Sequence, residues 1–373
     1  MVVCACQKSI RNWQLNSIPP TTTVANLLEK QSATVGKIYT DIGFWGGIIP
    51  GNDNELAPMV SKGVVGFKCF LCPSGVEEFP NVSEQDIEIA YKRLEHLNTL
   101  IAFHAEKCDE VSIDEPLGDV HEYETYLKTR PASLELKALD TIFRVMQRYK
   151  SVRTHIVHLS TVNAIPMIRE CRKVVGERLT VETCHHYLTL DAKEVPKYRV
   201  DFKCCPPIRD EFNQHRLWQG IIDGDIQLIV SDHSPSTAEM KLLVPGPDFG
   251  NFMKSWGGIS SVQFGLSLFW TNCQKYGLGI KDMIRLMSEE PAKLCGFQHK
   301  KGKLAKGYDA DLCIWDPSAE FKVALDIIHF KNKANPYMDK TLKGCVHATV
   351  VRGKFAFKRS EANPFRLAGQ ILK

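Results

Sequence analysis

The sequence predicts an α/β protein built around a TIM-barrel-like parallel sheet, followed by a small β-rich domain. Apolar runs of strand length alternate with segments of helical spacing from residue 37 to about residue 295. Five of these runs contain, or lead into, an ionisable or metal-capable side chain. Since the carboxyl ends of parallel barrel strands meet at one face, these side chains are expected to converge there.

The five apolar runs carry different polar groups. They are residues 63–70 with Lys68, 100–103 before His104, 154–157 before His158, 179–183 before Cys184-His185-His186, and 226–230 before Asp232. Burial of an ammonium is unfavourable. Lys68 is therefore interpreted either as a lysine that extends to solvent from a strand end or as a neutral lysine that is modified or binds a metal. The two histidines are metal-ligand candidates, although a single strand-end histidine is more often only hydrogen-bonded, and Asp232 alone would be read as a helix or turn cap.

Helices and turns between these runs follow from local signals. Ser83 and Asp86 form a capping-box pattern before a helix with its apolar residues on one face. Further helices are predicted over residues 24–31, 131–145 and 161–173, and a strand over residues 37–44, ended by Gly46-Gly47. Six barrel strands are recognisable, near residues 37, 63, 100, 154, 179 and 226, whereas a closed barrel has eight. We therefore expect an incomplete barrel.

The character of the chain changes after residue 296. Glycine turns and short strands follow, and residues 346–351 and 354–357 are predicted to form a hairpin around Arg352-Gly353. We expect three parts: residues 1–14 outside the recognisable pattern, a partial barrel over residues 15–296, and a β-rich domain with a tail over residues 297–373.

The composition excludes several classes of protein. Of the 373 residues, 44% are hydrophobic and 24% charged, which is typical of a soluble globular protein. A net charge of +4 without a basic block argues against nucleic-acid binding, and no apolar run reaches the length of a membrane span. Thirteen scattered cysteines indicate reduced thiols inside the cell. We expect a cytoplasmic protein, with the mitochondrion as the alternative because residues 1–14 carry Lys8 and Arg11 but no acid.

Several motifs together resemble one family. They are Gly66-Phe67-Lys68-Cys69-Phe70, Phe103-His104-Ala105-Glu106, His155-Ile156-Val157-His158-Leu159-Ser160, Lys203-Cys204-Cys205-Pro206-Pro207-Ile208-Arg209-Asp210 and Val230-Ser231-Asp232-His233-Ser234-Pro235. Together with residues 15–21, 256–259 and 291–312, they resemble the allantoinases, which are cyclic-amide hydrolases of the amidohydrolase superfamily. The similarity covers residues 15–358. Phe70 favours this family over the dihydropyrimidinases, which carry a tyrosine there.

The resemblance implies a metal-dependent hydrolase with two metal ions, usually zinc. It implies that Lys68 is carboxylated and bridges the metals, that His104 and His158 hold one of them, and that Asp232 binds the other and moves a proton. Hydroxide attack on the ring amide is the expected reaction. The substrate would be allantoin, converted to allantoate in purine (urate) catabolism, by a homo-oligomer, a tetramer by family.

The resemblance also assigns a substrate-binding wall. The backbone around Cys205 and around Trp256, Gly257, Gly258 and Ile259 would hold the planar amides of the ring. Cys205 stands where the family commonly has serine. A backbone contact with substrate would tolerate that change, whereas a hydroxyl contact would not.

One family feature is missing from the sequence. The family begins its barrel with a His-x-His strand that supplies two ligands to the second metal, and no His-x-His occurs in the 373 residues. We therefore expect at most one bound zinc and impaired activity. The alternatives are a non-catalytic allantoinase-like subunit that assembles with full-length chains, and a cyclic amidase of the dihydropyrimidinase or dihydroorotase type.

Overall fold

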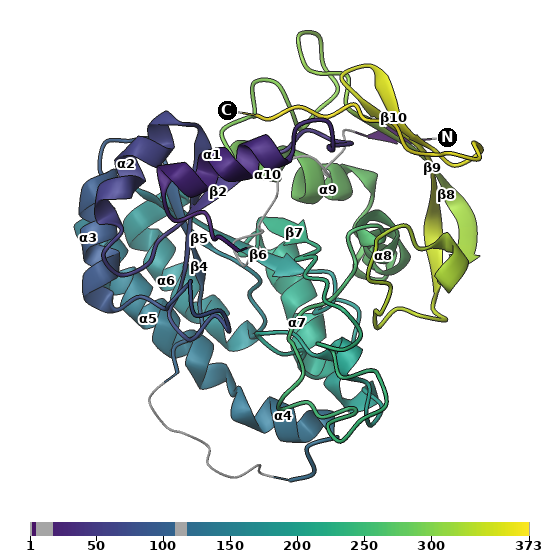
Figure 1. Cartoon of the computed structure of the whole chain (residues 1–373), viewed down its shortest axis with the longest axis horizontal. Helices are drawn as coiled ribbons and strands as arrows, with labels where there is room; N and C mark the ends of the chain where they lie inside the picture. The colour runs from purple at the N-terminus through teal and green to yellow at the C-terminus, as the bar shows by residue number, and fades with distance from the viewer. Residues whose placement is uncertain (1, 5–17, 109–117, 373) are drawn as a thin grey trace.

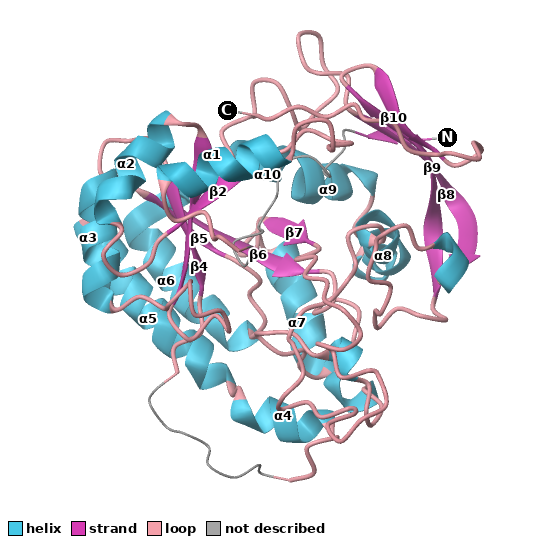
Figure 2. Ribbon diagram, in the orientation of Figure 1, coloured by secondary structure: helices cyan, strands magenta, loops and turns pink. Residues whose placement is uncertain are grey.

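The computed structural model describes residues 2–4, 18–108 and 118–372, and it contains two separate β-sheets (Figures 1 and 2). One sheet has six parallel strands and the other has four antiparallel strands. In Figure 1, α2, α3, α5 and α6 cover the outer side of the parallel strands, and the antiparallel sheet lies at the opposite edge of the molecule. None of the described helices is long and apolar enough to cross a membrane.

The parallel sheet follows the order of the chain, β2 to β7. Its strands are β2 (Phe44–Gly47), β3 (Val64–Phe70), β4 (Leu100–His104), β5 (Arg153–Ile156), β6 (Leu179–Cys184) and β7 (Leu228–Val230). Each neighbouring pair is joined through a crossover that contains at least one helix, which is the connection that parallel strands require. The prediction of a six-stranded partial barrel is therefore confirmed.

The predicted strand over residues 37–44 was wrong in its position. The strand begins at Phe44 and includes both glycines that were expected to end it. A side chain on Gly46 would come within 2.6 Å of the Phe67 ring, and one on Gly47 would collide with the Phe79 ring. Glycine occurs inside this strand because neighbouring aromatic rings pack directly on its backbone.

Ten α-helices are present in the described part of the chain. They are α1 (Val24–Ala33), α2 (Asp53–Ser61), α3 (Glu84–Leu94), α4 (Tyr123–Thr129), α5 (Ala132–Arg148), α6 (Ile165–Val175), α7 (Glu211–Ile222), α8 (Gly265–Cys273), α9 (Ile280–Ile284) and α10 (Glu290–Leu294). The capping box at Ser83 and Asp86 forms as predicted. Helices α2, α4 and α7 to α10 had no predicted range, and α2 has Pro58 inside it.

The second sheet has the order β1-β8-β9-β10. It contains β1 (Val2–Cys4), β8 (Leu312–Lys322), β9 (Thr341–Val351) and β10 (Lys354–Lys358). The predicted hairpin is formed by β9 and β10. The first strand of the chain pairs with β8, so it belongs to this small sheet and not to the barrel. The rest of residues 1–14 lies outside the described residues, and the domain division at residues 296 and 297 stays a prediction.

A group of charges with three buried members, Asp41, Lys301 and Asp311, joins the two sheets. We call Asp41, Lys301, Asp309, Asp311 and Arg352 the Lys301 cluster. The Lys301 ammonium lies 2.6 Å from Asp41 Oδ2, 2.9 Å from Asp309 Oδ2 and 2.5 Å from Asp311 Oδ2. Arg352 also pairs with Asp41. Because Asp41 precedes the parallel sheet and the other members lie in or next to the small-sheet region, these contacts fix the two sheets relative to each other.

Candidate functional site

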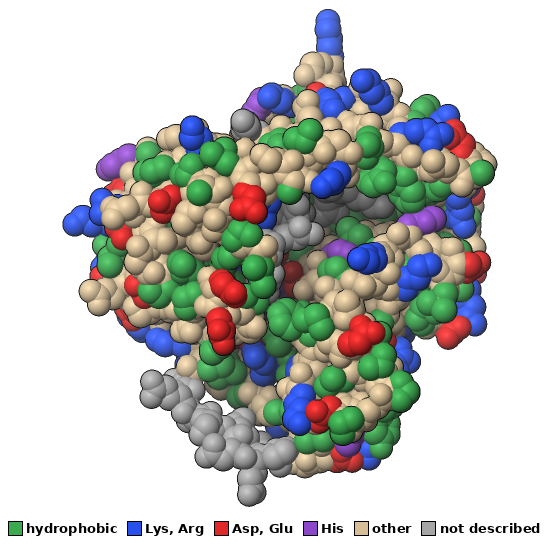
Figure 3. All heavy atoms as spheres, in the orientation of Figure 1, with side chains coloured by type: hydrophobic (Ala, Val, Ile, Leu, Met, Phe, Trp, Pro, Cys, Tyr) green, Lys and Arg blue, Asp and Glu red, His purple; other side chains and the backbone are tan. Residues whose placement is uncertain are grey.

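A cavity of about 1350 Å³ opens beside the C-terminal ends of the parallel strands. Figure 3 shows the molecule hollowed between its two halves. Lys68, His104, His158 and Asp232 all line this cavity, and we call them the cavity cluster. Lys68 lies within β3, His104 ends β4, and the other two follow β5 and β7 by two residues. Strands far apart in the sequence therefore bring all four side chains to one space.

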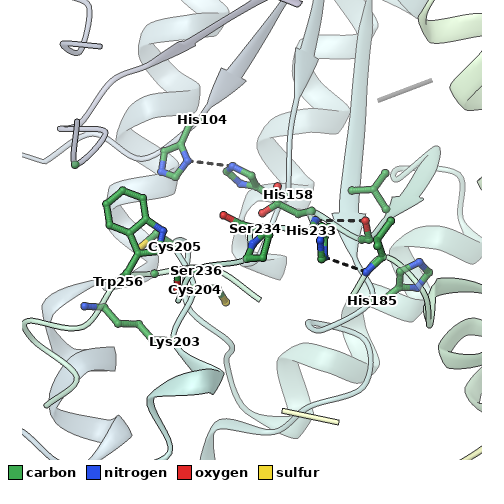
Figure 4. Close-up of a pocket in the computed structure, with 18 of the residues that line it drawn as sticks. His104, His158, His185, Lys203, Cys204, Cys205, His233, Ser234, Ser236 and Trp256 are labelled. Atoms are coloured by element: carbon green, nitrogen blue, oxygen red, sulfur yellow. Dashed lines mark hydrogen bonds between the residues drawn. The ribbon is translucent and has the colours of Figure 1, made fainter. Parts of the chain in front are cut away.

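The two histidines of the cavity cluster face each other. His104 Nδ1 and His158 Nε2 are 3.0 Å apart (Figure 4). Two imidazole nitrogens bound to one tetrahedral zinc at about 2.0–2.1 Å would be separated by about 3.3 Å. The observed spacing is close to that value, so the pair fits the requirement for two ligands on one metal ion.

A carboxylate sets the orientation of His104. Glu106 is buried, and its Oε2 lies 2.8 Å from His104 Nε2 and 2.7 Å from Arg130 Nη1. With the ring proton held on Nε2 by this carboxylate, the lone pair of Nδ1 points toward His158. Burial opposes the ionisation of Glu106, but Arg130 and His104 together hold its pKa below the usual value.

Two members of the cavity cluster have an unusual backbone. His158 has φ 40° and Asp232 has φ 42°, both in the left-handed region. This conformation costs roughly 1–2 kcal/mol for a residue with a side chain. Such strain persists where the surrounding structure imposes it, and it often marks functional positions. Burial lowers the pKa of His158 well below its usual value, so its ring is neutral, as a metal ligand must be.

Lys68 is buried between the histidines and the acidic groups of the barrel. Burial lowers the pKa of Lys68, whereas Asp232 and Glu182 raise it. Its ammonium nitrogen lies 5.0 Å from the centre of the Phe70 ring, and that ring stacks on His104. A lowered pKa increases the fraction of neutral amine, the form that can be chemically modified.

The predicted substrate wall lies on the same cavity. Cys205, Trp256, Gly257 and Gly258 line it, while Ile259 is buried next to it and accepts a hydrogen bond from Ser234 N (3.0 Å). Gly258 has φ 144°, and a side chain there would collide with Ser234. Only glycine allows this close approach of the two backbone segments.

His233 has no role predicted from the sequence. Its Nδ1 accepts hydrogen bonds from Ser261 N (2.9 Å) and Val262 N (3.2 Å), which places its ring proton on Nε2. Burial lowers the pKa of His233 to about 4, so the ring stays neutral. His233 thus holds the segment that follows the substrate wall. His233 and Glu106 both belong to motifs that carry the family resemblance, but nothing in the sequence showed which backbone or side-chain groups they contact.

Two further groups of possible metal ligands lie within the described residues: Cys72, His104 and Glu106, and Asp41, Asp309 and Asp311. In both groups, a positively charged side chain of the protein already pairs with the carboxylates. Arg130 pairs with Glu106, and the Lys301 ammonium lies among the three aspartates. We assign neither group to a metal.

A partial parallel barrel with these side chains around one cavity defines the class of protein as a hydrolase of the amidohydrolase type. The sequence pattern of the amidohydrolase family matches residues 19–356. The chain belongs to this family. Within it, the chain groups with the allantoinases, as the following relatives show.

The allantoinase of Saccharomyces cerevisiae is 41% identical over 368 residues, which are 98% of this chain and 78% of that protein. The mitochondrial allantoinase of Aquarana catesbeiana is 46% identical over 289 residues, 77% of this chain and 58% of that one. Among solved structures, an L-hydantoinase (dihydropyrimidinase) from Arthrobacter aurescens superposes with a TM-score of 0.87 at 26% identity, covering 97% of this chain and 79% of that one. The dihydropyrimidinases are thus a related family.

Proposed function

We propose that the cavity hydrolyses the cyclic amide of allantoin to allantoate, a step of purine (urate) breakdown. The observation that carries the proposal is the 3.0 Å approach of His104 Nδ1 and His158 Nε2 beside Lys68, in a chain that is 41% identical to an allantoinase. The dihydropyrimidinase alternative has only the more distant structural likeness in its favour.

The site residues would divide the chemistry among them. His104, His158 and a carboxylated Lys68 would hold one zinc ion, and Lys68 and Asp232 would contribute to a second. A bound zinc ion ionises water and polarises the scissile carbonyl. Asp232 accepts the proton of the attacking water and delivers it to the leaving ring nitrogen. The backbone at Cys205 and along residues 256–259 orients the planar ring.

The number of ligands limits the second metal. The 373 residues contain no His-x-His, so Lys68 and Asp232 would be its only protein ligands among those the family supplies. A catalytic zinc normally has three protein ligands and a water. We propose that the 373-residue chain binds at most one zinc ion. Without the second metal ion, the transition state would lose stabilisation of several kcal/mol. Because about 1.4 kcal/mol corresponds to a tenfold change in rate, the turnover would be slower by orders of magnitude.

The test compares the 373-residue chain with a chimera that adds a relative's His-x-His segment ahead of residue 19. Zinc content and allantoin hydrolysis at neutral pH are measured for both. We expect at most one zinc and little turnover for the chain, and two zinc ions with restored turnover for the chimera. Two zinc ions and full turnover in the chain would contradict the single-metal proposal. A zinc-loaded chimera that hydrolyses dihydropyrimidines but not allantoin would contradict the substrate.

The assembly and location follow from the same family assignment. We propose a homotetramer in the cytoplasm, and one relative's name gives the mitochondrion as the alternative. Light scattering on the purified chain tests the assembly. An inactive chain that forms mixed oligomers with a complete allantoinase would instead favour the role of a non-catalytic subunit.

A further inference from the structure

The segment that carries His158 is held by a buried carboxylate from another element. Glu135 of α5 is only 2% exposed. Its Oε2 accepts hydrogen bonds from Ser160 N (2.9 Å) and Thr161 N (3.2 Å), the second and third residues after His158. The carboxylate of Glu135 therefore holds the backbone two and three residues after the left-handed residue.

Arg209 pairs with this carboxylate. Burial raises the pKa of Glu135, and the guanidinium of Arg209 opposes that shift and favours the charged form. Its Nη2 donates to Glu135 Oε1 at 2.7 Å, and the arginine side chain is only 12% exposed. Arg209 belongs to the motif of residues 203–210, which also contains Cys205 of the cavity wall. One motif thus reaches the cavity on one side and the His158 segment on the other.

Residues 207 and 213, in and just after the motif of residues 203–210, form further hydrogen bonds with the segment that follows His158. Ser160 Oγ donates to Pro207 O (2.6 Å), and Asn213 Nδ2 donates to Ser160 O (2.8 Å). Val162 N donates to Asn213 Oδ1 (2.8 Å). Residues 160–162 therefore have their polar groups satisfied from two sides, with Glu135 as the only charged contact among those described.

We propose that Glu135 and Arg209 are a positioning pair that holds His158 Nε2 opposite His104 Nδ1 and so sets the metal affinity of the site. The inference rests on the proposed function, because it concerns the same metal site. Neither residue lines the cavity, so neither is a catalytic residue. Groups that orient a metal ligand typically change metal affinity by 10–100-fold when they are altered.

The physical reason is the backbone of His158. A left-handed residue relaxes toward a commoner conformation when its surroundings release it. The hydrogen bonds at Ser160 and Thr161 lie within three residues of that strained position. Removing the charge of Glu135 weakens both bonds, since hydrogen bonds to an ionised acceptor are about twice as strong as neutral ones. The imidazole would then lose its fixed direction.

The experiment uses the full chain with Glu135→Gln, which keeps the size of the side chain but not its charge. Zinc affinity is measured by competition with a chromophoric chelator, and ligand geometry by the visible spectrum of the cobalt(II) form. The matched control is Asp225→Asn. It removes the charge of another largely buried carboxylate, which pairs with Arg169 at 2.6 Å and does not line the cavity.

We expect E135Q to weaken zinc binding by about 10–100-fold and to change the cobalt spectrum. D225N should lower the melting temperature without either effect. Zinc affinity of E135Q within twofold of the wild type would overturn the inference. If E135Q does not fold, R209K replaces it, with a smaller weakening expected because one ammonium cannot reproduce the guanidinium fork; an unchanged affinity would again overturn it. A wild-type chain that binds no zinc would overturn the proposed metal site itself.

Discussion

The cavity cluster and the Lys301 cluster both bury ionisable side chains, but they satisfy them in opposite ways. In the Lys301 cluster, three carboxylates surround one ammonium within 2.9 Å, and Arg352 adds a second cation. In the cavity cluster, two neutral imidazoles share one hydrogen bond of 3.0 Å, and the backbone at His158 and Asp232 is strained. Charges that compensate one another are typical of a structural role, whereas facing imidazole nitrogens and a strained backbone are typical of a ligand-binding position.

The strongest test of the cavity side is Asp232→Asn in the chimera that carries His-x-His. Turnover of allantoin should fall about 10³-fold or more, since an amide cannot accept the proton. Stability should change little, because asparagine tolerates the left-handed backbone as aspartate does. Steady-state kinetics and a thermal melt measure both. Turnover within tenfold of the parent would remove Asp232 from the mechanism.

The corresponding test of the other side is Lys301→Met. It leaves the buried carboxylates of Asp41 and Asp311 without their ammonium, and we expect the free energy of unfolding to fall by about 3–5 kcal/mol. Zinc affinity should not change. Lys301→Arg, which keeps a cation, is the control and should lose less. A decrease of less than 1 kcal/mol in the free energy of unfolding measured in urea would contradict the structural role of the Lys301 cluster. A decrease in zinc affinity would show that the two clusters are not independent.

Acid should affect the cavity side through its neutral histidines. His185 and His186 follow β6, and burial lowers the pKa of each from 6.5 to about 3. Between pH 6.5 and about 3 the unfolded chain binds protons that the folded chain does not, so stability falls as the pH falls. The expected slope is about 1.4 kcal/mol per pH unit for each histidine.

His186→Phe should remove the contribution of one histidine to the pH dependence of the free energy of unfolding. Among the described residues neither ring nitrogen of His186 has a hydrogen-bond partner, so the replacement leaves no donor unsatisfied. Urea unfolding of metal-free protein at pH 8 and at pH 5 measures the change. The loss of stability between the two should be smaller in the variant by about 2 kcal/mol. An equal loss would show that His186 is protonated in the folded state.

The smallest expected effect concerns strain alone. His158→Gly and His158→Ala both remove the imidazole, but glycine accepts φ 40° and alanine does not. The glycine variant should be more stable by about 1 kcal/mol. Glu95, with φ −57°, is the control position, where glycine should be no better than alanine. Urea unfolding that ranks alanine above glycine at position 158 would show that the left-handed backbone is not imposed on His158.

Patterns within the chain predicted most of the parallel sheet. Strands β3 to β7 read as apolar runs, and the capping box of α3 has a local signal. The exact place of β2 had no such signal, because its glycines are explained only by Phe67 and Phe79 packing from other segments. The same limit applies to the site. The sequence pointed to His104 and His158, but the pairing of Glu135 with Arg209 joins residues 74 positions apart, which no local pattern reveals.

Asp41 has a consequence for the order of events during synthesis. Its carboxylate contacts Lys301, Arg352 and the backbone of Gln370, which follow it by 260, 311 and 329 residues. The parallel strands, in contrast, join neighbours that leave the ribosome one after another. Contacts between distant residues form late because a long loop must close first. A nascent chain can therefore assemble the sheet strand by strand, whereas the contacts of Asp41 form only after almost the entire polypeptide has been made. A chain arrested before that point would contain the parallel sheet without the contacts that join it to the small sheet.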